Sequence, residues 1–263
     1  MKIFKNLLIV FCSVLFLASC DKTVLDYGEV QKLTPETPII KINYASPYKD
    51  DRFVIVKFNG RRVTSRIQNR TPFPGGGLNT RGDLRADFLT VEPGEVKLTI
   101  ATPFKIDNGL DSLEIFSTTM TIEKGKRYVV HITDTAKLTK TVLTEERFLL
   151  PDSGYAEYRF INLMPNVPAL DLYYGQSATV HTADRLIASN IQFLKISDYI
   201  RLNRASARTW KIRAAGAAST TAPIASYTST SSLLNQRAYT IYANGYLGGT
   251  TGNAPFLSLF FVR

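Results

Sequence analysis

The chain of 263 residues has few of the side chains that build covalent cross-links or metal sites: two cysteines and two histidines. These numbers exclude a disulfide scaffold and a zinc site made from Cys and His alone. The Gly-x-Ser-x-Gly, His-Glu-x-x-His and glycine-rich phosphate-loop patterns are absent as well. We therefore expect no catalytic residues, no metal and no cofactor.

What is present is ordinary for a globular protein, with 44% hydrophobic and 21% charged residues. The charge is unbalanced, because 32 Lys and Arg against 22 Asp and Glu give a formal net charge of +10. A basic surface attracts anionic partners such as nucleic acid or acidic polysaccharide. The N-terminal sequence indicates which of these two partners, nucleic acid or acidic polysaccharide, the protein meets.

The first 19 residues have the layout of a secretory signal peptide, with Lys2 and Lys5 ahead of the apolar run 7–18. Twelve helical residues span about 18 Å, which is too short for a bilayer core of roughly 30 Å. The segment ends in Leu-Ala-Ser-Cys, which resembles the lipobox of bacterial lipoproteins. We therefore expect cleavage after residue 19 and lipid attachment at Cys20, the only cysteine of the mature chain.

The expected anchor determines where the protein works. Two or three acyl chains such as palmitate anchor a protein far more firmly than one. Asp21 and Lys22 follow Cys20. An Asp at this place resembles the inner-membrane retention signal of enterobacteria, whereas charged residues here accompany export to the cell surface in Bacteroidota-like lipoproteins. We expect the outer membrane and the cell surface, with a periplasm-facing position as the alternative, and no nucleic-acid partner.

After a tether over residues 20–37, short stretches of alternating β-branched, aromatic and polar residues predict strands, as at Phe53–Phe58 and Tyr128–Ile132. The pattern is repeated: Ile42-Asn43-Tyr44 before a strand and Asn59-Gly60 parallels Ile161-Asn162-Leu163 before a strand and Gly175. We predict an all-β fold of two tandem Ig-like β-sandwiches, residues 38–136 and 154–263, joined by a linker over 137–153. Each half is long enough to fold independently.

A family resemblance supports this expectation. The resemblance lies in residues 161–175, which read Ile-Asn-Leu-Met-Pro-Asn-Val-Pro-Ala-Leu-Asp-Leu-Tyr-Tyr-Gly. This segment is similar to the opening of domain of unknown function 4397, which reads V-H-A-S-P-D-A-P-A-V-D-V-Y-V-D-G. The first half departs from it, with Tyr48-Lys49-Asp50-Asp51 at the Asp-Ala-Pro-Ala step. The resemblance implies tandem Ig-like sandwiches of secreted and surface proteins, including Bacteroidota lipoproteins. It brings no activity or site.

Two basic stretches are candidate sites for an anionic ligand, although either could be a solvated surface. They comprise Arg61, Arg62, Arg66, Arg70, Arg81 and Arg85 in the first half, and Arg201, Arg204, Arg208, Lys211 and Arg213 in the second. The connection between Arg61 and Phe88 contains Gly75-Gly76-Gly77, and loops of this length are usually functional or mobile.

Other candidates are weaker. Asp111-Ser112-Leu113 and Asp134-Thr135-Ala136 match an Asp-Ser/Thr-apolar O-glycosylation pattern, which predicts modification at Ser112 and Thr135. Alternation places Trp210 and Ile212 inward, with Lys211 and Arg213 facing solvent. The surface-aromatic candidates are Tyr173, Tyr227 and Tyr246.

These features favour a non-catalytic binding or adhesion protein, whose partners are the membrane, through the anchor, and a polysaccharide or an outer-membrane protein. The alternative is a structural or accessory subunit of an outer-membrane assembly, such as a glycan-uptake complex or a fimbrial base. The C-terminal run Phe256–Val262 would then pair with the edge of a partner's sheet. A glycosidase is a third possibility, since paired carboxylates need not be close in sequence.

Overall fold

The computed structural model describes residues 32–104, 111–147, 149–179, 181–203, 209–229 and 235–263. The signal peptide, Cys20 and most of the tether lie outside this part of the chain, as do Arg204 and Arg208. Among the described residues the fold is all-β, as predicted, with two 3-10 turns and no α-helix. In these ranges no helix has the length and apolar character needed to cross a membrane.

The first half of the chain forms two antiparallel-rich sheets. One has the order β10-β9-β1-β4 with β6 also on β1, and the other has the order β3-β2-β7-β8. The strands are β1 (Ile39–Tyr44), β2 (Ile55–Phe58), β3 (Arg61–Arg62), β4 (Thr71–Phe73), β6 (Leu89–Thr90), β7 (Gly94–Pro103), β8 (Asp111–Ile122), β9 (Arg127–Thr133) and β10 (Lys140–Glu145).

The second half repeats this topology with the sheet orders β14-β11-β17-β18-β5 and β13-β12-β15-β16. Its strands are β11 (Tyr155–Asn162), β12 (Ala169–Gly175), β13 (Arg185–Gln192), β14 (Ile200–Asn203), β15 (Thr209–Ala214), β16 (Ala225–Thr228), β17 (Ala238–Asn244) and β18 (Phe256–Phe261). In both halves the first strand runs parallel to the penultimate one, β1 to β9 and β11 to β17. The internal repeat predicted from the sequence is therefore a repeat of topology.

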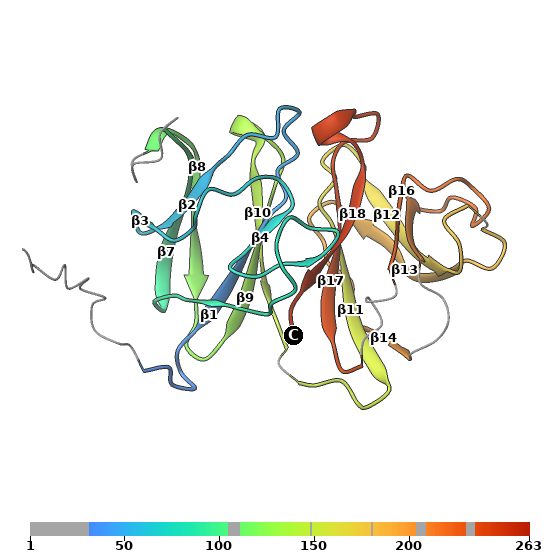
Figure 1. Ribbon diagram of the computed structural model, residues 1–263, viewed down its shortest axis with the longest axis horizontal. Coiled ribbons are helices and arrows are strands. Elements are labelled where there is room, and N and C mark those ends of the chain that lie inside the picture. Colours follow the sequence, from blue (N-terminus) through green and yellow to red (C-terminus); the bar gives the residue numbers. More distant parts are fainter. Residues whose placement is uncertain (1–31, 105–110, 148, 180, 204–208, 230–234) are drawn as a thin grey trace, which may run out of the picture. The chain divides into compact units, whose positions relative to one another are not determined.

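Each sandwich has its own core, and a third cluster joins the sandwiches. Figure 1 shows the sheets in sequence from the β2–β7 sheet, through those of β1 and β17, to the β12–β15 sheet. The cluster in the middle draws on both halves, with Ala45 and Val129 from the first and Ile161, Tyr242 and Phe260 from the second. We call this contact the seam. Pro35–Arg263 accordingly forms one compact unit.

The expected linker and the long connection after Arg61 both contain strands. Within the 137–153 linker, residues 140–145 form β10, which pairs with β9. The connection after Arg61 crosses to the second sandwich, where β5 (Gly77–Leu78) pairs with β18. A side chain at Gly77 would overlap the Leu259 carbonyl group, so this strand pairing requires glycine there.

The C-terminal strand is therefore already paired on both sides. β18 pairs with β17 along its length and with β5 at Leu259 and Phe260. The expectation that Phe256–Val262 pairs with a partner's sheet is wrong at Leu259 and Phe260, because β5 of the same chain pairs with them.

Candidate functional site

Most of the predicted basic residues are engaged separately by their own neighbours. Arg85 forms ion pairs with Asp83 and Asp87, and Arg201 pairs with Asp152. Arg61 and Arg62 form β3, and the Arg62 Nε donates to the Thr64 carbonyl oxygen. Arg66 stacks on Phe53, with 4.4 Å from the guanidinium carbon to the ring centroid.

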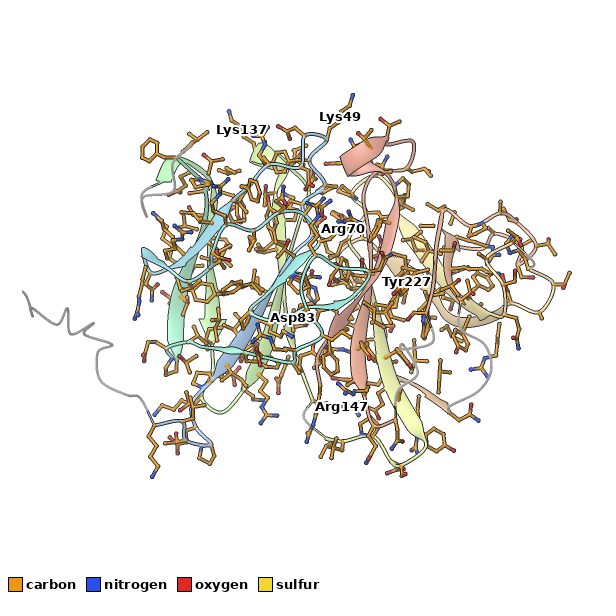
Figure 2. The ribbon with its side chains drawn as sticks, viewed as in Figure 1. Lys49, Arg70, Asp83, Lys137, Arg147 and Tyr227 are labelled. Carbon is orange, nitrogen blue, oxygen red and sulfur yellow. The ribbon has the colours of Figure 1, made fainter. Side chains whose placement is uncertain are left out.

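Arg70 and Arg81 differ, because the fold brings them to one pocket at the seam. This cavity of about 250 Å³ combines three loops of the first sandwich with the start of β18 and the turn before it, η3 (Thr251–Asn253). Arg70, labelled in Figure 2, lies where the first sandwich meets β18. We call this cavity the seam pocket; it is lined by Asp51, Asn69, Arg70, Arg81, Thr251, Gly252, Ala254 and Phe256.

The seam pocket contains one ion pair and a donor that the protein leaves unused. Asp51 forms an ion pair with Arg81 through Oδ2, while its Oδ1 is buried and accepts no hydrogen bond from the described residues. Arg81 also donates to Gln68 Oε1 at 2.7 Å. The guanidinium of Arg70 stacks on Phe256 at 3.9 Å, and no acceptor for it occurs within the described ranges.

The walls of the seam pocket are held by contacts between the sandwiches. Asn69, which is buried, donates from Nδ2 to the Gly252 carbonyl oxygen at 3.3 Å and accepts from Asn244 Nδ2 at 2.7 Å. Asp51, Arg70 and Thr251 adopt left-handed backbone conformations, with φ of 49°, 65° and 53°. Such conformations cost about 1–3 kcal/mol each and cluster at functional sites. Three of them around one cavity mark it as a candidate binding site.

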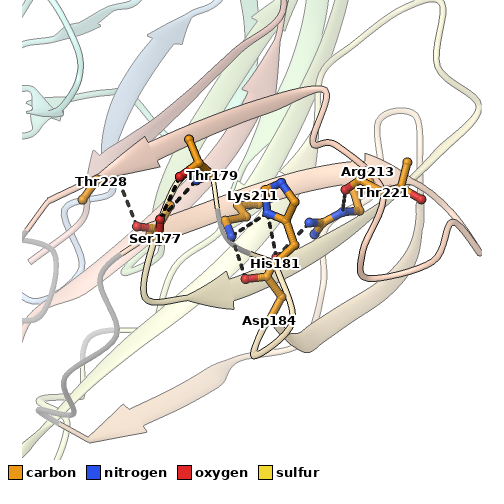
Figure 3. A network of polar contacts seen from close by, with 9 residues as sticks. Ser177, Thr179, His181, Asp184, Lys211, Arg213, Thr221 and Thr228 are labelled. Atoms are coloured by element: carbon orange, nitrogen blue, oxygen red, sulfur yellow. Dashed lines mark hydrogen bonds and ion pairs between the residues drawn. The ribbon is translucent and has the colours of Figure 1, made fainter.

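A second polar cluster lies under a loop on the outer face of β15 (Figure 3). Asp184 accepts from Lys211 Nζ at 2.7 Å and from Arg213 Nη2 at 2.8 Å, and His181 Nδ1 lies 3.0 Å from Lys211 Nζ. Lys211 and Arg213 are 0% and 1% exposed. Their predicted solvent exposure is wrong, because the loop that carries Asp184 covers this face and neutralises them.

A third cluster connects His131 to the seam. His131 Nε2 lies 3.3 Å from Thr144 Oγ1, which donates to Glu146 Oε1 at 3.1 Å, and Glu146 forms a buried ion pair with Arg159. Burial lowers the pKa of His131 to about 3, so the ring is neutral at physiological pH. Because the charges in this cluster and in that of Asp184 are buried and paired with one another, we assign both a structural role.

The structure confirms the prediction for Trp210 and corrects some of those for the surface tyrosines. Trp210 is 0% exposed, as predicted. Tyr173 is not a surface aromatic: it is buried beneath Arg213, and its hydroxyl donates to the Ala217 carbonyl oxygen. Tyr227 packs against the second core, and the Tyr246 hydroxyl donates to Asp134 at 2.6 Å.

The two O-glycosylation candidates stay predictions. Thr135 is partly buried, with its Oγ1 3.4 Å from the Tyr246 hydroxyl. Ser112 lies near the start of β8, and its side chain is outside the described part. Among the described residues no group of three or more His, Cys, Asp or Glu is arranged to hold a metal.

Sequence reasoning found Arg70 and Arg81 but missed Asp51, Asn69 and Phe256 as site residues. The five residues come from segments about 200 positions apart, so no local pattern could group them. The one available signal was the unusual connection that carries Asn69, Arg70 and Arg81.

The protein therefore belongs to the class of all-β proteins built from two tandem β-sandwiches, and it has a polar pocket at the seam between them. Residues 83–173 match the family described as Domain of unknown function (DUF4397). This match confirms the resemblance predicted from residues 161–175, and it runs from the first sandwich into β12 of the second. No curated protein matches the sequence.

A search of solved structures returned the crystal structure of CBMbc (family CBM26) from Eubacterium rectale Amy13K in complex with maltoheptaose. The sequences are 12% identical, the alignment covers 83% of this chain and 95% of that one, and the TM-score is 0.21. A score this low carries no argument about the function of this chain.

Proposed function

We propose that this protein is a lipid-anchored, non-catalytic cell-surface protein that binds a saccharide in the seam pocket. The observation that carries the proposal is the Arg70 guanidinium, a donor without an acceptor among the described residues, which stacks on Phe256 in a cavity that Asp51 also lines. Sugar hydroxyls donate and accept hydrogen bonds, and Phe256 adds an aromatic surface to the same site.

The size and composition of the seam pocket support binding without catalysis. Its volume of about 250 Å³ lies below the roughly 300–1,000 Å³ of pockets for drug-sized ligands. It therefore suits one sugar unit at the end or side of a longer glycan. Asp51 is the only carboxylate among the lining residues, whereas most glycosidases need a pair.

The anchor rests on the sequence around Cys20 and makes its own testable claim. We expect the mature chain to begin at Cys20 with three acyl chains, at the outer membrane and facing the outside of the cell. Intact-mass analysis of the membrane-extracted protein should show loss of residues 1–19 and added lipid. A Cys20→Ala protein that is cleaved normally yet stays in the membrane would contradict this.

Saccharide binding is tested with the purified full chain in detergent, against a panel of neutral and acidic oligosaccharides. Asp51→Ala should lower the affinity at least tenfold, because it removes a carboxylate that lines the cavity and pairs with Arg81. Asp152→Ala is the matched control, since this exposed carboxylate on the second sandwich carries the same charge. Binding that survives Asp51→Ala, or no binding to any panel member, would overturn the proposal.

The accessory-subunit alternative relied on a free C-terminal strand. β18 offers less of a free edge to a partner than that alternative expects, because β5 pairs with it at Leu259 and Phe260.

A further inference from the structure

Arg70 is held in position by contacts at both ends of the residue. Its backbone N–H donates to the Tyr44 carbonyl oxygen at 2.9 Å, and its φ of 65° fixes the direction in which the side chain leaves the loop. The guanidinium then lies over the ring of Phe256 in the other sandwich. A half-buried guanidinium stacked in this way is pre-organised, so little side-chain entropy is lost when it binds a ligand.

Arg70 differs from the two stacked arginines that are buried, because no carboxylate forms an ion pair with it among the described residues. Arg159 and Arg213, stacked on tyrosine rings in buried positions, each pair with a carboxylate. The pKa of Arg70 is lowered by burial, and the nearby charge of Arg81 lowers it further. Asp51 is already paired with Arg81. The seam pocket therefore carries one positive charge that the protein leaves uncompensated.

A bare inorganic anion fits this arrangement poorly. The Asp51 carboxylate lines the same cavity, and its negative charge repels an anion that makes no other contact there. A ligand that carries both a carboxylate and hydroxyl groups satisfies both residues. Its carboxylate can pair side-on with the guanidinium of Arg70, and a hydroxyl can donate to Asp51.

We propose that the saccharide bound in the seam pocket is acidic, a uronic acid unit whose carboxylate pairs with Arg70. This inference rests on the proposed function and narrows it to one substrate class. It makes Arg70 the residue that determines specificity, Asp51 the acceptor for a sugar hydroxyl, and Phe256 the support that keeps the guanidinium in place.

The experiment is calorimetric titration of the full chain in detergent with uronate oligosaccharides of the galacturonate, glucuronate and mannuronate series. Each is compared with its methyl ester, which is neutral and nearly isosteric. At least one acid should bind tenfold or more tightly than its ester. The affinity of that acid should fall as salt is raised, because the contact is between charges. Inorganic sulfate, which carries no hydrogen at neutral pH, should not compete at equal concentration.

Two variants test whether Arg70 causes the preference for the acid over its ester. Arg70→Gln should remove the preference for the acid while binding of the ester changes little. Arg85→Gln is the matched control, because it deletes the same charge from an exposed side chain that already pairs with Asp83 and Asp87. It should keep the preference. If Arg70→Gln does not fold, the ratio of acid to ester affinity in the unmodified chain still decides the matter.

The possible failures are distinguishable. Equal affinity for acid and ester, with both lost in Asp51→Ala, would overturn the uronate inference and leave saccharide binding intact. A preference that persists in Arg70→Gln would overturn the role of Arg70. Competition by sulfate would show a simple anion site and overturn the uronate inference. Absence of binding to every acidic and neutral oligosaccharide would overturn the proposed function as well.

Discussion

Lys41 and Phe261 connect the two sandwiches through a buried hydrogen bond, in which Lys41 Nζ donates to the Phe261 carbonyl oxygen at 2.7 Å. The residues are 220 positions apart, on β1 and β18. The same amine donates to the Arg85 carbonyl oxygen and lies 4.7 Å from the centroid of the Phe260 ring. No carboxylate contacts it among the described residues, so this contact joins the sandwiches while burying an unpaired amine.

That burial should make the stability of the protein depend on pH. Desolvation lowers the pKa of Lys41 to about 7, although the charges of Asp87, Asp83 and Glu146 oppose the shift. Between pH 7 and about 10.4 the unfolded chain therefore binds a proton that the folded chain does not. The free energy of unfolding should rise with pH in this window, by at most about 1.4 kcal/mol per pH unit.

Denaturant titrations at several pH values between 7 and 10 measure this slope. Lys41→Met should reduce the slope of the free energy of unfolding against pH. Lys49→Met, at an exposed position, should keep the slope of the unmodified chain. Parallel curves for the unmodified chain and Lys41→Met would show that Lys41 keeps its proton in the folded state.

Trp210 anchors the core of the second sandwich. Its ring lies between Tyr158 at 4.7 Å and Tyr174 at 4.6 Å, measured between centroids. Trp210→Ala should lower the free energy of unfolding by about 3–5 kcal/mol, through lost burial and the cavity that remains. The single tryptophan should emit at short wavelength in the folded protein and shift to the red on unfolding. Water-like emission of the folded chain would contradict this position.

Asp184 neutralises two buried cations, so its charge should contribute far more to the free energy of unfolding than the charge of an exposed carboxylate does. Asp184→Asn leaves Lys211 and Arg213 without their anion and should cost about 3–5 kcal/mol. Asp152→Asn makes the same change in the exposed pair with Arg201 and should cost about 1 kcal/mol or less. Similar losses in the two variants, measured by urea unfolding, would refute the structural role of the cluster.

The seam should make the second sandwich depend on the first. A fragment of residues 151–263 lacks β5 and exposes Ile161, Tyr242 and Phe260. We expect it to unfold at a lower urea concentration than the full chain or to aggregate, because a hydrophobic face and part of a strand edge become open to solvent. If the fragment unfolds at the same urea concentration as the full chain, the halves are independent, as their lengths alone predict.

The limits of sequence reasoning are clear on β15. Alternation correctly placed Trp210 and Ile212 inward, since successive strand residues face opposite sides. The same alternation placed Lys211 and Arg213 in solvent, and this failed because Asp184, 27 and 29 positions away, returns on a loop to cover them. A period-two pattern reports which side of a strand a residue faces. It does not report what else packs there.

The sequence by itself determined the all-β class, the repeated topology and the inward faces of the strands, because these depend on local alternation and turn residues. Only the tertiary structure decided that β5 closes the edge of β18, that Lys41 is buried, and that Asp51, Arg70 and Phe256 share one pocket. Each of these depends on contacts between segments about 180 to 220 positions apart. Such contacts follow from how the two sandwiches pack at the seam, which no local pattern encodes.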